Sequence, residues 1–144
     1  MSVYSYIQEH VNVKIAPSKL HGVGIFALRD IEPGENLFVE WKNPSVKQSI
    51  TQKQLESLPE SIRSHIYDMF EYSNVDGVWE FNIYLEKDCY WIFKTPTHWI
   101  NSCSWDSQPN VDLIASKALL HIKNGTELLT KYGKYQKNKP SRVL

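Results

Sequence analysis

Cysteine and net charge are both scarce in this sequence. Only two cysteines, Cys89 and Cys103, occur among its 144 residues. Two thiols complete neither a four-thiolate zinc site nor a disulfide framework, so we expect no metal site and a reducing compartment. Lys plus Arg and Asp plus Glu number 16 each, so no excess charge points to direct binding of nucleic acid or of a membrane surface.

Long hydrophobic runs are missing as well. The apolar runs extend over a few residues, whereas a membrane-spanning helix needs about 20, and the N-terminus lacks a basic start followed by an apolar stretch. We therefore expect a soluble, intracellular protein, with nucleus and cytoplasm both open. Hydrophobic residues make up 42% of the chain, and no repeat or low-complexity tract divides it. Residues 1–144 are predicted to form a single domain.

The hydrophobic pattern predicts a β-rich chain with a small helical insert. Residues 49–72 carry apolar side chains at helical spacing, divided by Pro59, and are predicted to form two short helices. Alternating or continuous β-branched and aromatic stretches predict strands on both sides of this insert, at residues 11–15, 25–27, 37–39, 78–85 and 119–123.

Three turn signals separate the predicted elements. In Glu32–Glu35, proline and glycine occupy the two central positions that a type II turn prefers. Asp76-Gly77 and Asn124-Gly125 each lie between aromatic or β-branched segments and each predict a hairpin.

A glycine-rich loop follows the first predicted strand. Gly22 and Gly24 flank a single residue, and two glycines at a strand end let backbone amides approach a ligand without a Cβ in the way. An isolated G-x-G is nevertheless more often a plain tight turn. No G-x-G-x-x-G leads into a helix and no Gly-Lys-Ser/Thr follows, so the loop does not indicate dinucleotide or nucleoside triphosphate binding.

Two further segments stand out in the second half of the chain. The first runs Trp99-Ile100-Asn101-Ser102-Cys103, with Pro109-Asn110 further on; alone, its asparagine reads as a capped turn beside a buried tryptophan. The second, residues 122–133, has the sequence I-K-N-G-T-E-L-L-T-K-Y-G. Its tyrosine, Tyr132, would alone read as a half-buried packing residue.

In this order, the segments resemble the SET-domain family of protein-lysine methyltransferases. The match begins at Ser18–Glu35, S-K-L-H-G-V-G-I-F-A-L-R-D-I-E-P-G-E, and continues through the asparagine segment to the tyrosine segment. The resemblance implies a β-rich α+β fold of several short β-sheets, in which the tyrosine segment threads the asparagine segment as a pseudoknot. It also implies a SET core at about 11–133, a helical insert at about 49–72 and a C-terminal tail at 134–144.

The resemblance further implies a site for S-adenosylmethionine. The loop that holds the cofactor's amino-acid end would comprise Leu20, His21, Gly22, Val23 and Gly24. Asn101 would hold the methionine amino group, and Ser102 would contribute its backbone. Tyr132 would orient the lysine amine as the catalytic tyrosine and would also belong to the cofactor-binding residues. Tyr135 would stack on the adenine, unless it is only a tail residue. Tyr72 is our candidate for a second channel tyrosine, with core packing as its alternative.

The sequence also departs from the family pattern. Ser102 stands where the family has histidine, seven residues rather than four separate Asn101 from Pro109, and no cysteine-rich zinc segment follows Gly133. Thr130 replaces the aromatic residue that governs how many methyl groups are added, so the degree of methylation is not predicted.

Three functions remain open at this point. The leading prediction is methylation of a lysine in a protein or peptide substrate, a histone tail among the candidates, with a second copy of the chain left open as a partner. The alternative is a catalytically inactive SET-like domain that binds a peptide or protein, since fold alone does not confer activity. A carbohydrate-binding or other β-rich enzyme, suggested by the five tryptophans, ranks third because no paired-carboxylate or nucleophile–base motif accompanies them.

Overall fold

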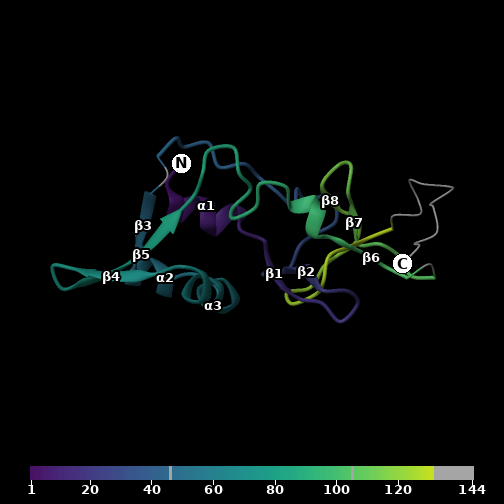
Figure 1. Ribbon diagram of the computed structural model, residues 1–144, viewed down its shortest axis with the longest axis horizontal. Helices are drawn as coiled ribbons and strands as arrows, with labels where there is room; N and C mark the ends of the chain where they lie inside the picture. Colours follow the sequence, from purple (N-terminus) through teal and green to yellow (C-terminus); the bar gives the residue numbers. More distant parts are fainter. Residues whose placement is uncertain (46, 105, 132–144) are drawn as a thin grey trace.

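The computed structural model describes residues 1–45, 47–104 and 106–131. The molecule is elongated, and its elements gather at two ends (Figure 1). One end, here termed the helical end, contains α1 (Val3–His10), β3 (Lys47–Thr51), α2 (Gln52–Glu56), α3 (Glu60–Met69), β4 (Tyr72–Val75) and β5 (Val78–Tyr84). The other, the β end, contains β1 (Val13–Pro17), β2 (Val23–Ala27), the short 3-10 helix η1 (Pro96–Trp99), β6 (Asn101–Ser102), β7 (Val111–Asp112), β8 (Lys117–Ala118) and β9 (Leu129–Thr130).

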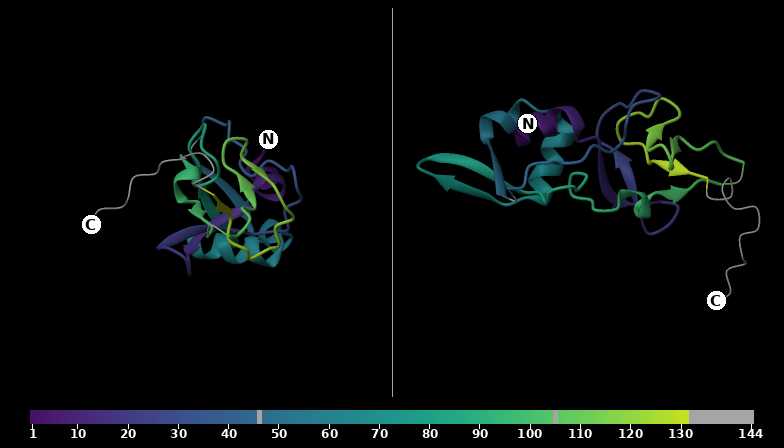
Figure 2. Two further views of the ribbon diagram at one scale, coloured as in Figure 1. Left: turned by 90° about the vertical axis from the view of Figure 1, so that its right-hand side faces the viewer. Right: turned by 90° about the horizontal axis from the view of Figure 1, so that it is seen from above.

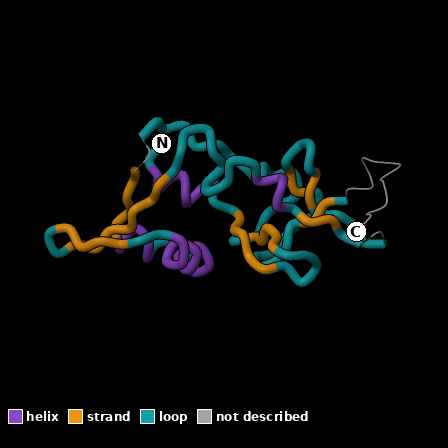
Figure 3. Tube along the Cα trace, in the orientation of Figure 1, coloured by secondary structure: helices purple, strands orange, loops and turns teal. Residues whose placement is uncertain are grey.

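The strands of the described residues form four small sheets. The helical end carries an antiparallel three-stranded sheet in the order β3-β5-β4, and the β end carries the antiparallel pairs β1-β2 and β7-β8 and the parallel pair β6-β9. Long loops join these elements, as the tube in Figure 3 shows. The view from above in Figure 2 separates the two ends again. The predicted β-rich fold with small helices and several small sheets is confirmed.

Local capping explains the short helices. Thr51 caps α2 in a capping box, in which its side chain accepts from the Gln54 amide while the Gln54 side chain accepts from the Thr51 amide. Pro59 immediately precedes α3, where its fixed φ suits the start of a helix. The two helices predicted within residues 49–72 are confirmed, although the first three residues of that range belong to β3. The sequence analysis makes no prediction for residues 1–10, where α1 forms with Ser2 as its N-cap.

Two of the three turn predictions are confirmed. In the turn over Glu32–Glu35 the Glu35 amide donates to the Glu32 carbonyl, and Gly34 has a φ of +87°. Asp76 and Gly77, with φ of +52° and +82°, join β4 to β5 in a two-residue hairpin. Around Asn124-Gly125 the hairpin prediction is wrong: the chain turns there, but its flanks pair with other segments, at Ile31 and Phe26, rather than with each other.

Two predicted strands are wrong. Residues 37–39 form no strand because their backbone partners change along the segment: the Leu37 amide donates to Ser116, and the Trp41 amide donates to Cys89. Residues 119–123 likewise keep only an isolated bridge between Ile122 and Ile31. Leu37 and Ile122 are buried, but neither segment has a continuous strand partner beside it.

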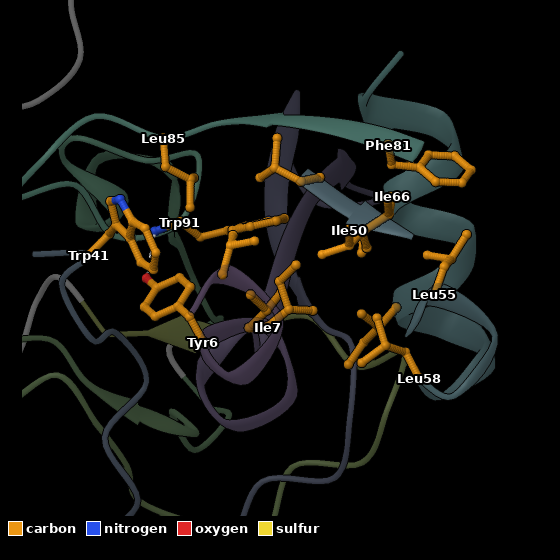
Figure 4. Packing of buried hydrophobic residues seen from close by; sticks show 14 of the residues in the cluster. Tyr6, Ile7, Trp41, Ile50, Leu55, Leu58, Ile66, Phe81, Leu85 and Trp91 are labelled. Carbon is orange, nitrogen blue, oxygen red and sulfur yellow. Dashed lines mark hydrogen bonds between the residues drawn. The ribbon is translucent and has the colours of Figure 1, made fainter. Parts of the chain in front are cut away.

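Apolar side chains form two clusters, one in each end of the molecule. Figure 4 shows the cluster of the helical end, where the Tyr6 and Trp41 rings meet edge to face at 5.2 Å between centroids. The second cluster fills the β end around Ile25, Ile31 and Leu128. Ile92 packs against both clusters and so connects them.

None of the helices in the described ranges combines the length and the apolar character that crossing a bilayer requires.

Candidate functional site

The glycine-rich loop between β1 and β2 is held by its own first residues. Pro17 pairs with Val23 at the end of the two strands, and the Ser18 amide donates to the Gly22 carbonyl at 2.9 Å. The Ser18 hydroxyl also accepts from the amides of Leu20 and His21, at 3.0 and 3.3 Å. The loop therefore has a defined conformation that does not depend on its exposed side chains.

One carboxylate links this loop to the asparagine segment. Glu127 is half-buried and accepts from the Ser18 hydroxyl at Oε1, over 2.8 Å, and from Asn101 Nδ2 at Oε2, over 2.9 Å. Hydrogen bonds to an ionised group are stronger than neutral ones. Glu127 thus joins three segments that are far apart in sequence.

The orientation of the Asn101 amide follows from what surrounds it. Its Nδ2 donates to the carbonyls of His21 and Val23, at 3.1 and 3.0 Å, as well as to Glu127. Three oxygens around one terminal atom identify that atom as the nitrogen. Within the part of the chain that the structure describes, Asn101 Oδ1 accepts no hydrogen bond, so it remains available as an acceptor.

The two glycines of the loop serve different purposes. Gly22 has a φ of +48°, and a Cβ there would meet nothing within 4 Å. A Cβ on Gly24 would lie 2.2 Å from Glu127 Oε2 and 3.0 Å from Asn101 Nδ2. The missing side chain at Gly22 leaves open space, whereas the missing side chain at Gly24 makes room for the Glu127 carboxylate.

The chain around Glu127 passes between the two ends of the asparagine loop. On one side β9 pairs in parallel with β6, and the Cys103 amide donates to Thr130. On the other side Asn110 donates from Nδ2 to the Glu127 carbonyl at 2.9 Å and accepts the Leu129 amide at 2.7 Å. This arrangement is the threading expected of the fold.

The structure brings together most of the predicted cofactor residues. Leu20, His21, Gly22, Val23 and Gly24 form the loop, Asn101 contacts it directly, and Ser102 follows on β6, where its hydroxyl donates to the Cys103 carbonyl. Trp99, which the alternative of a capped turn at Asn101 would bury, is 44% exposed. Its helix η1 contacts β2.

Of the predicted tyrosines, Tyr72 alone is among the described residues. Tyr132 and Tyr135 fall outside the described residues; β9 ends at Thr130, two positions before Tyr132. Tyr72 lies on β4 in the hairpin that extends away from β6, so the structure does not bring it to Asn101 (Figure 1). The hypothesis of Tyr72 as a second channel tyrosine therefore conflicts with its position in the fold.

Ser18 and Glu127 are site residues that the sequence analysis missed. Both belong to the segments that carried the resemblance, and Glu127 occupies the acidic position before the leucine of the third segment. The signal was therefore present. The role of Glu127 at the site depends on the isolated bridge between Phe26 and Glu127. This bridge joins residues about 100 positions apart, and no local pattern reveals it.

The SET domain family matches residues 22–133. This range covers more than half of the chain, so the chain belongs to the SET domain family. No curated protein matches the sequence.

The chain is also similar to several solved structures. A putative histone methyltransferase from Plasmodium falciparum is 19% identical with a TM-score of 0.37, over 88% of this chain and 97% of that one. The apo, autoinhibited Polycomb Repressive Complex 2 of Chaetomium thermophilum is 21% identical with a TM-score of 0.39, over 85% of this chain. This chain spans only 15% of the Polycomb chain, and it spans the same share of a humanized, inhibitor-bound form of that complex.

Proposed function

We propose that the protein transfers a methyl group from S-adenosylmethionine to a lysine side chain of a protein substrate. Membership of the SET domain family supports methyl transfer to lysine in general. The observation that carries the proposal is the Asn101 amide, whose nitrogen is fixed by two loop carbonyls and Glu127, while its oxygen accepts no hydrogen bond from the residues that the structure describes. A polar group held in one orientation before a ligand arrives lowers the cost of binding that ligand.

The residues of the site fit the amino-acid end of this cofactor. Asn101 Oδ1 is an acceptor for an ammonium group, and Gly22 leaves the adjacent backbone uncovered. Leu20 and Val23, which are 59% and 40% exposed, offer apolar surface on the same loop. S-adenosylmethionine supplies a methyl group activated by its sulfonium. Ser102 would contribute backbone contacts beside Asn101.

The protein must also present the lysine amine in its neutral form. The ordinary pKa of lysine is about 10.4, so an uncharged amine at neutral pH requires removal from water or loss of the proton to water. Holding the amine in line with the methyl group can contribute several kcal/mol. We propose that the hydroxyl of Tyr132, two positions after β9 in the sequence, orients the amine. Tyr135 is proposed to stack on the adenine.

Calorimetric titration with S-adenosylmethionine tests the cofactor. We expect binding by the wild-type chain and at least tenfold weaker binding by Asn101→Ala, because the acceptor for the ammonium group is removed. Asn43→Ala, which changes a half-buried asparagine at the helical end, is the matched control and should bind like the wild type. Absence of heat at millimolar cofactor would exclude the proposal.

Turnover is tested separately from binding. Incubation of a proteome extract with cofactor labelled at the methyl group should label lysines in the presence of the wild-type chain. Tyr132→Phe should retain cofactor binding and lose most of the label, since it removes only the hydroxyl. If Tyr132→Phe labels as well as the wild type, the assigned role of this tyrosine is wrong.

A catalytically inactive peptide-binding domain is the second candidate. It is favoured by the sequence departure at Ser102, which stands where the family has histidine. Peptide binding without cofactor binding or labelling would support this second function over methyl transfer.

A further inference from the structure

A pocket lined by aromatic side chains lies at the helical end, remote from the candidate cofactor site. Its lining comes from four elements: Gln52 of α2, Tyr67 of α3, Tyr72 of β4, and Trp79 and Phe81 of β5. Its volume is about 240 Å³. Pockets for drug-sized ligands usually have about 300–1,000 Å³, so this one suits a single side-chain head group.

The rings of this pocket are arranged around its opening as walls and a floor. Phe81 is 2% exposed and forms the floor, while Tyr67, Tyr72 and Trp79 are 51%, 58% and 44% exposed and form the walls. Tyr67 meets Phe81 edge to face at 4.9 Å between centroids. Tyr72 meets Trp79 at 5.4 Å in the same geometry. Half-exposed rings held by contacts with one another cost little conformational entropy when a ligand binds.

The position of these rings is fixed by the sheet. Tyr72 pairs with Phe81 across β4 and β5, so both side chains stand on the sheet face that turns toward α2 and α3. Trp79 lies two residues from Phe81 on the same strand and therefore on the same face. The hairpin that carries them extends from the end of the molecule (Figure 1). The exposed fractions of Tyr67, Tyr72 and Trp79 show that the pocket is accessible from outside.

The segment that carries the pocket is acidic, which favours a cationic ligand. Residues 52–84 carry six acidic and two basic side chains, a formal charge of −4 with histidine neutral, in a chain whose net charge is zero. One of these carboxylates, Glu56, accepts from the lining residue Gln52 at 3.2 Å. Aromatic faces attract cations, and several faces around one opening are the arrangement that recognises quaternary ammonium groups.

We propose that this aromatic pocket binds the trimethylammonium head of a methylated lysine in a partner peptide. A quaternary ammonium is cationic, carries methyl groups that pack against rings, and has no N–H that needs an acceptor. An unmodified lysine ammonium keeps strong hydration and loses it on entry. The site is distinct from the proposed methyl-transfer site and needs no cofactor, so either proposal can fail without the other.

Titration of a short lysine peptide in three forms tests the proposal: unmodified, trimethylated, and with the neutral tert-butyl isostere of trimethyllysine. We expect the trimethylated peptide to bind at least tenfold more tightly than the other two, measured by heteronuclear NMR without S-adenosylmethionine. The shifts should be largest at the Trp79 indole and the residues that line the pocket with it. Equal binding of the neutral isostere would overturn the proposal, because the cation would then be irrelevant.

Variants test whether the trimethylated peptide binds at these rings. Trp79→Ala and Tyr72→Ala should each weaken the trimethylated peptide at least tenfold, with folding checked by thermal unfolding. Tyr84→Ala is the matched control: this tyrosine is 48% exposed on the same strand but stands on the opposite sheet face, and its loss should leave binding unchanged. Unchanged binding by Trp79→Ala and shifts located elsewhere in the wild type would overturn the site. Choline binding as tightly as the peptide would overturn the assignment to methyllysine.

Discussion

Among individual residues, the organisation of the candidate site depends most on Glu127. Its two carboxylate oxygens accept from a serine of the β1–β2 loop and from Asn101. The backbone carbonyl of the same residue accepts from Asn110. One residue therefore fixes the loop, the asparagine amide and the threaded chain together. Displacement of Glu127 should therefore disturb the loop, the asparagine amide and the threaded chain at once.

Gly24→Ala tests this arrangement. The new Cβ would lie 2.2 Å from Glu127 Oε2 and 2.9 Å from its Cδ, so the carboxylate must move and lose its hydrogen bonds. Hydrogen bonds to charged groups contribute about 1.5–3 kcal/mol each, and we expect a loss of about 2–4 kcal/mol in the free energy of unfolding. Urea unfolding measures this loss, and calorimetry should show weakened binding of S-adenosylmethionine.

Gly22→Ala is the matched control in the same loop. A Cβ there meets open space, and only the left-handed φ of +48° opposes it, at a cost of about 1 kcal/mol. If the two alanine variants lose the same stability, crowding at Glu127 is not the reason for the glycine at position 24.

Among the elements, α1 is held at its C-terminus by an arginine from the β end. The Arg29 guanidinium donates to the carbonyls of Ile7, Gln8 and Val11, at 3.0, 2.5 and 3.1 Å. These carbonyls belong to the last turn of the helix and its C-cap, where intrahelical donors are lacking. Arg29 thus satisfies the end of α1 and connects it to the segment that follows β2.

Arg29→Lys should separate geometry from charge. Lysine keeps the positive charge but not the planar fork that reaches three acceptors, so we expect a loss of about 1–2 kcal/mol in the free energy of unfolding. Hydrogen exchange should accelerate in α1 more than in β1 or β2. Equal acceleration throughout the chain would contradict a local capping role.

His65 connects α3 to the loop that carries Trp91 and makes stability depend on pH. The Trp91 indole N–H donates to His65 Nε2 at 2.8 Å, so the ring accepts there in its neutral form. Burial, with a smaller effect of the Lys14 charge, lowers the pKa of His65 to about 4, while Asp68 acts in the opposite direction. An unfolded chain has a histidine pKa of about 6.5.

The sign of this effect follows from which state binds the proton. Because the folded pKa is lower, protons favour the unfolded state, so the stability linked to His65 is complete above pH 6.5 and is lost as pH falls toward 4. The two values differ enough for a loss of up to about 3 kcal/mol. His65→Gln keeps an acceptor for Trp91 but does not titrate, and urea unfolding should show a flatter profile between pH 6.5 and 4. Identical profiles for the two proteins would refute this account.

The elements that the sequence predicts best are those set by local chemistry. Asp76-Gly77 adopts positive φ at both positions, which few residue types tolerate, and the hairpin follows from that pair. Residues 37–39 have an equally suitable strand composition, yet form none, because a strand also needs a continuous partner. The same limit applies to the candidate site: Gly24 and Asn101 belong to recognisable motifs, while their contact with Glu127 depends on long-range pairing.

In the molecule as a whole, two apolar clusters are joined by a few polar and apolar contacts. Ser61 on α3 donates to the Leu28 carbonyl at 2.5 Å and accepts from Asn124 at 3.2 Å. With Arg29 and Ile92, these contacts connect the helical end to the β end. The prediction that residues 1–144 form a single domain can therefore be tested by unfolding. A single cooperative unfolding transition is expected only if these contacts hold the two ends together.

The threading of the β end depends on Asn110, whose side chain bonds the passing chain twice. Asn110→Ala leaves the Glu127 carbonyl and the Leu129 amide without their partners in a half-buried place. Because each unsatisfied backbone group costs about 1–3 kcal/mol, we expect a loss of about 2–4 kcal/mol in the free energy of unfolding. Hydrogen exchange should accelerate at the amides of Cys103 and Leu129, which hold the two sides of the thread.

Asn124→Ala is the control for this last prediction. Its side chain is exposed and makes a single hydrogen bond to Ser61, so its removal should cost about 0.5 kcal/mol or less and leave exchange at Cys103 unchanged. If Asn110→Ala costs as little free energy of unfolding as Asn124→Ala, Asn110 does not hold the chain that passes through the asparagine loop. The parallel pairing of β6 with β9 must then be sufficient by itself. If instead exchange accelerates together at Cys103 and Leu129 in Asn110→Ala alone, the asparagine loop and the chain that passes through it open as one unit. The Asn101 amide would open with them, which ties cofactor binding to the integrity of the thread.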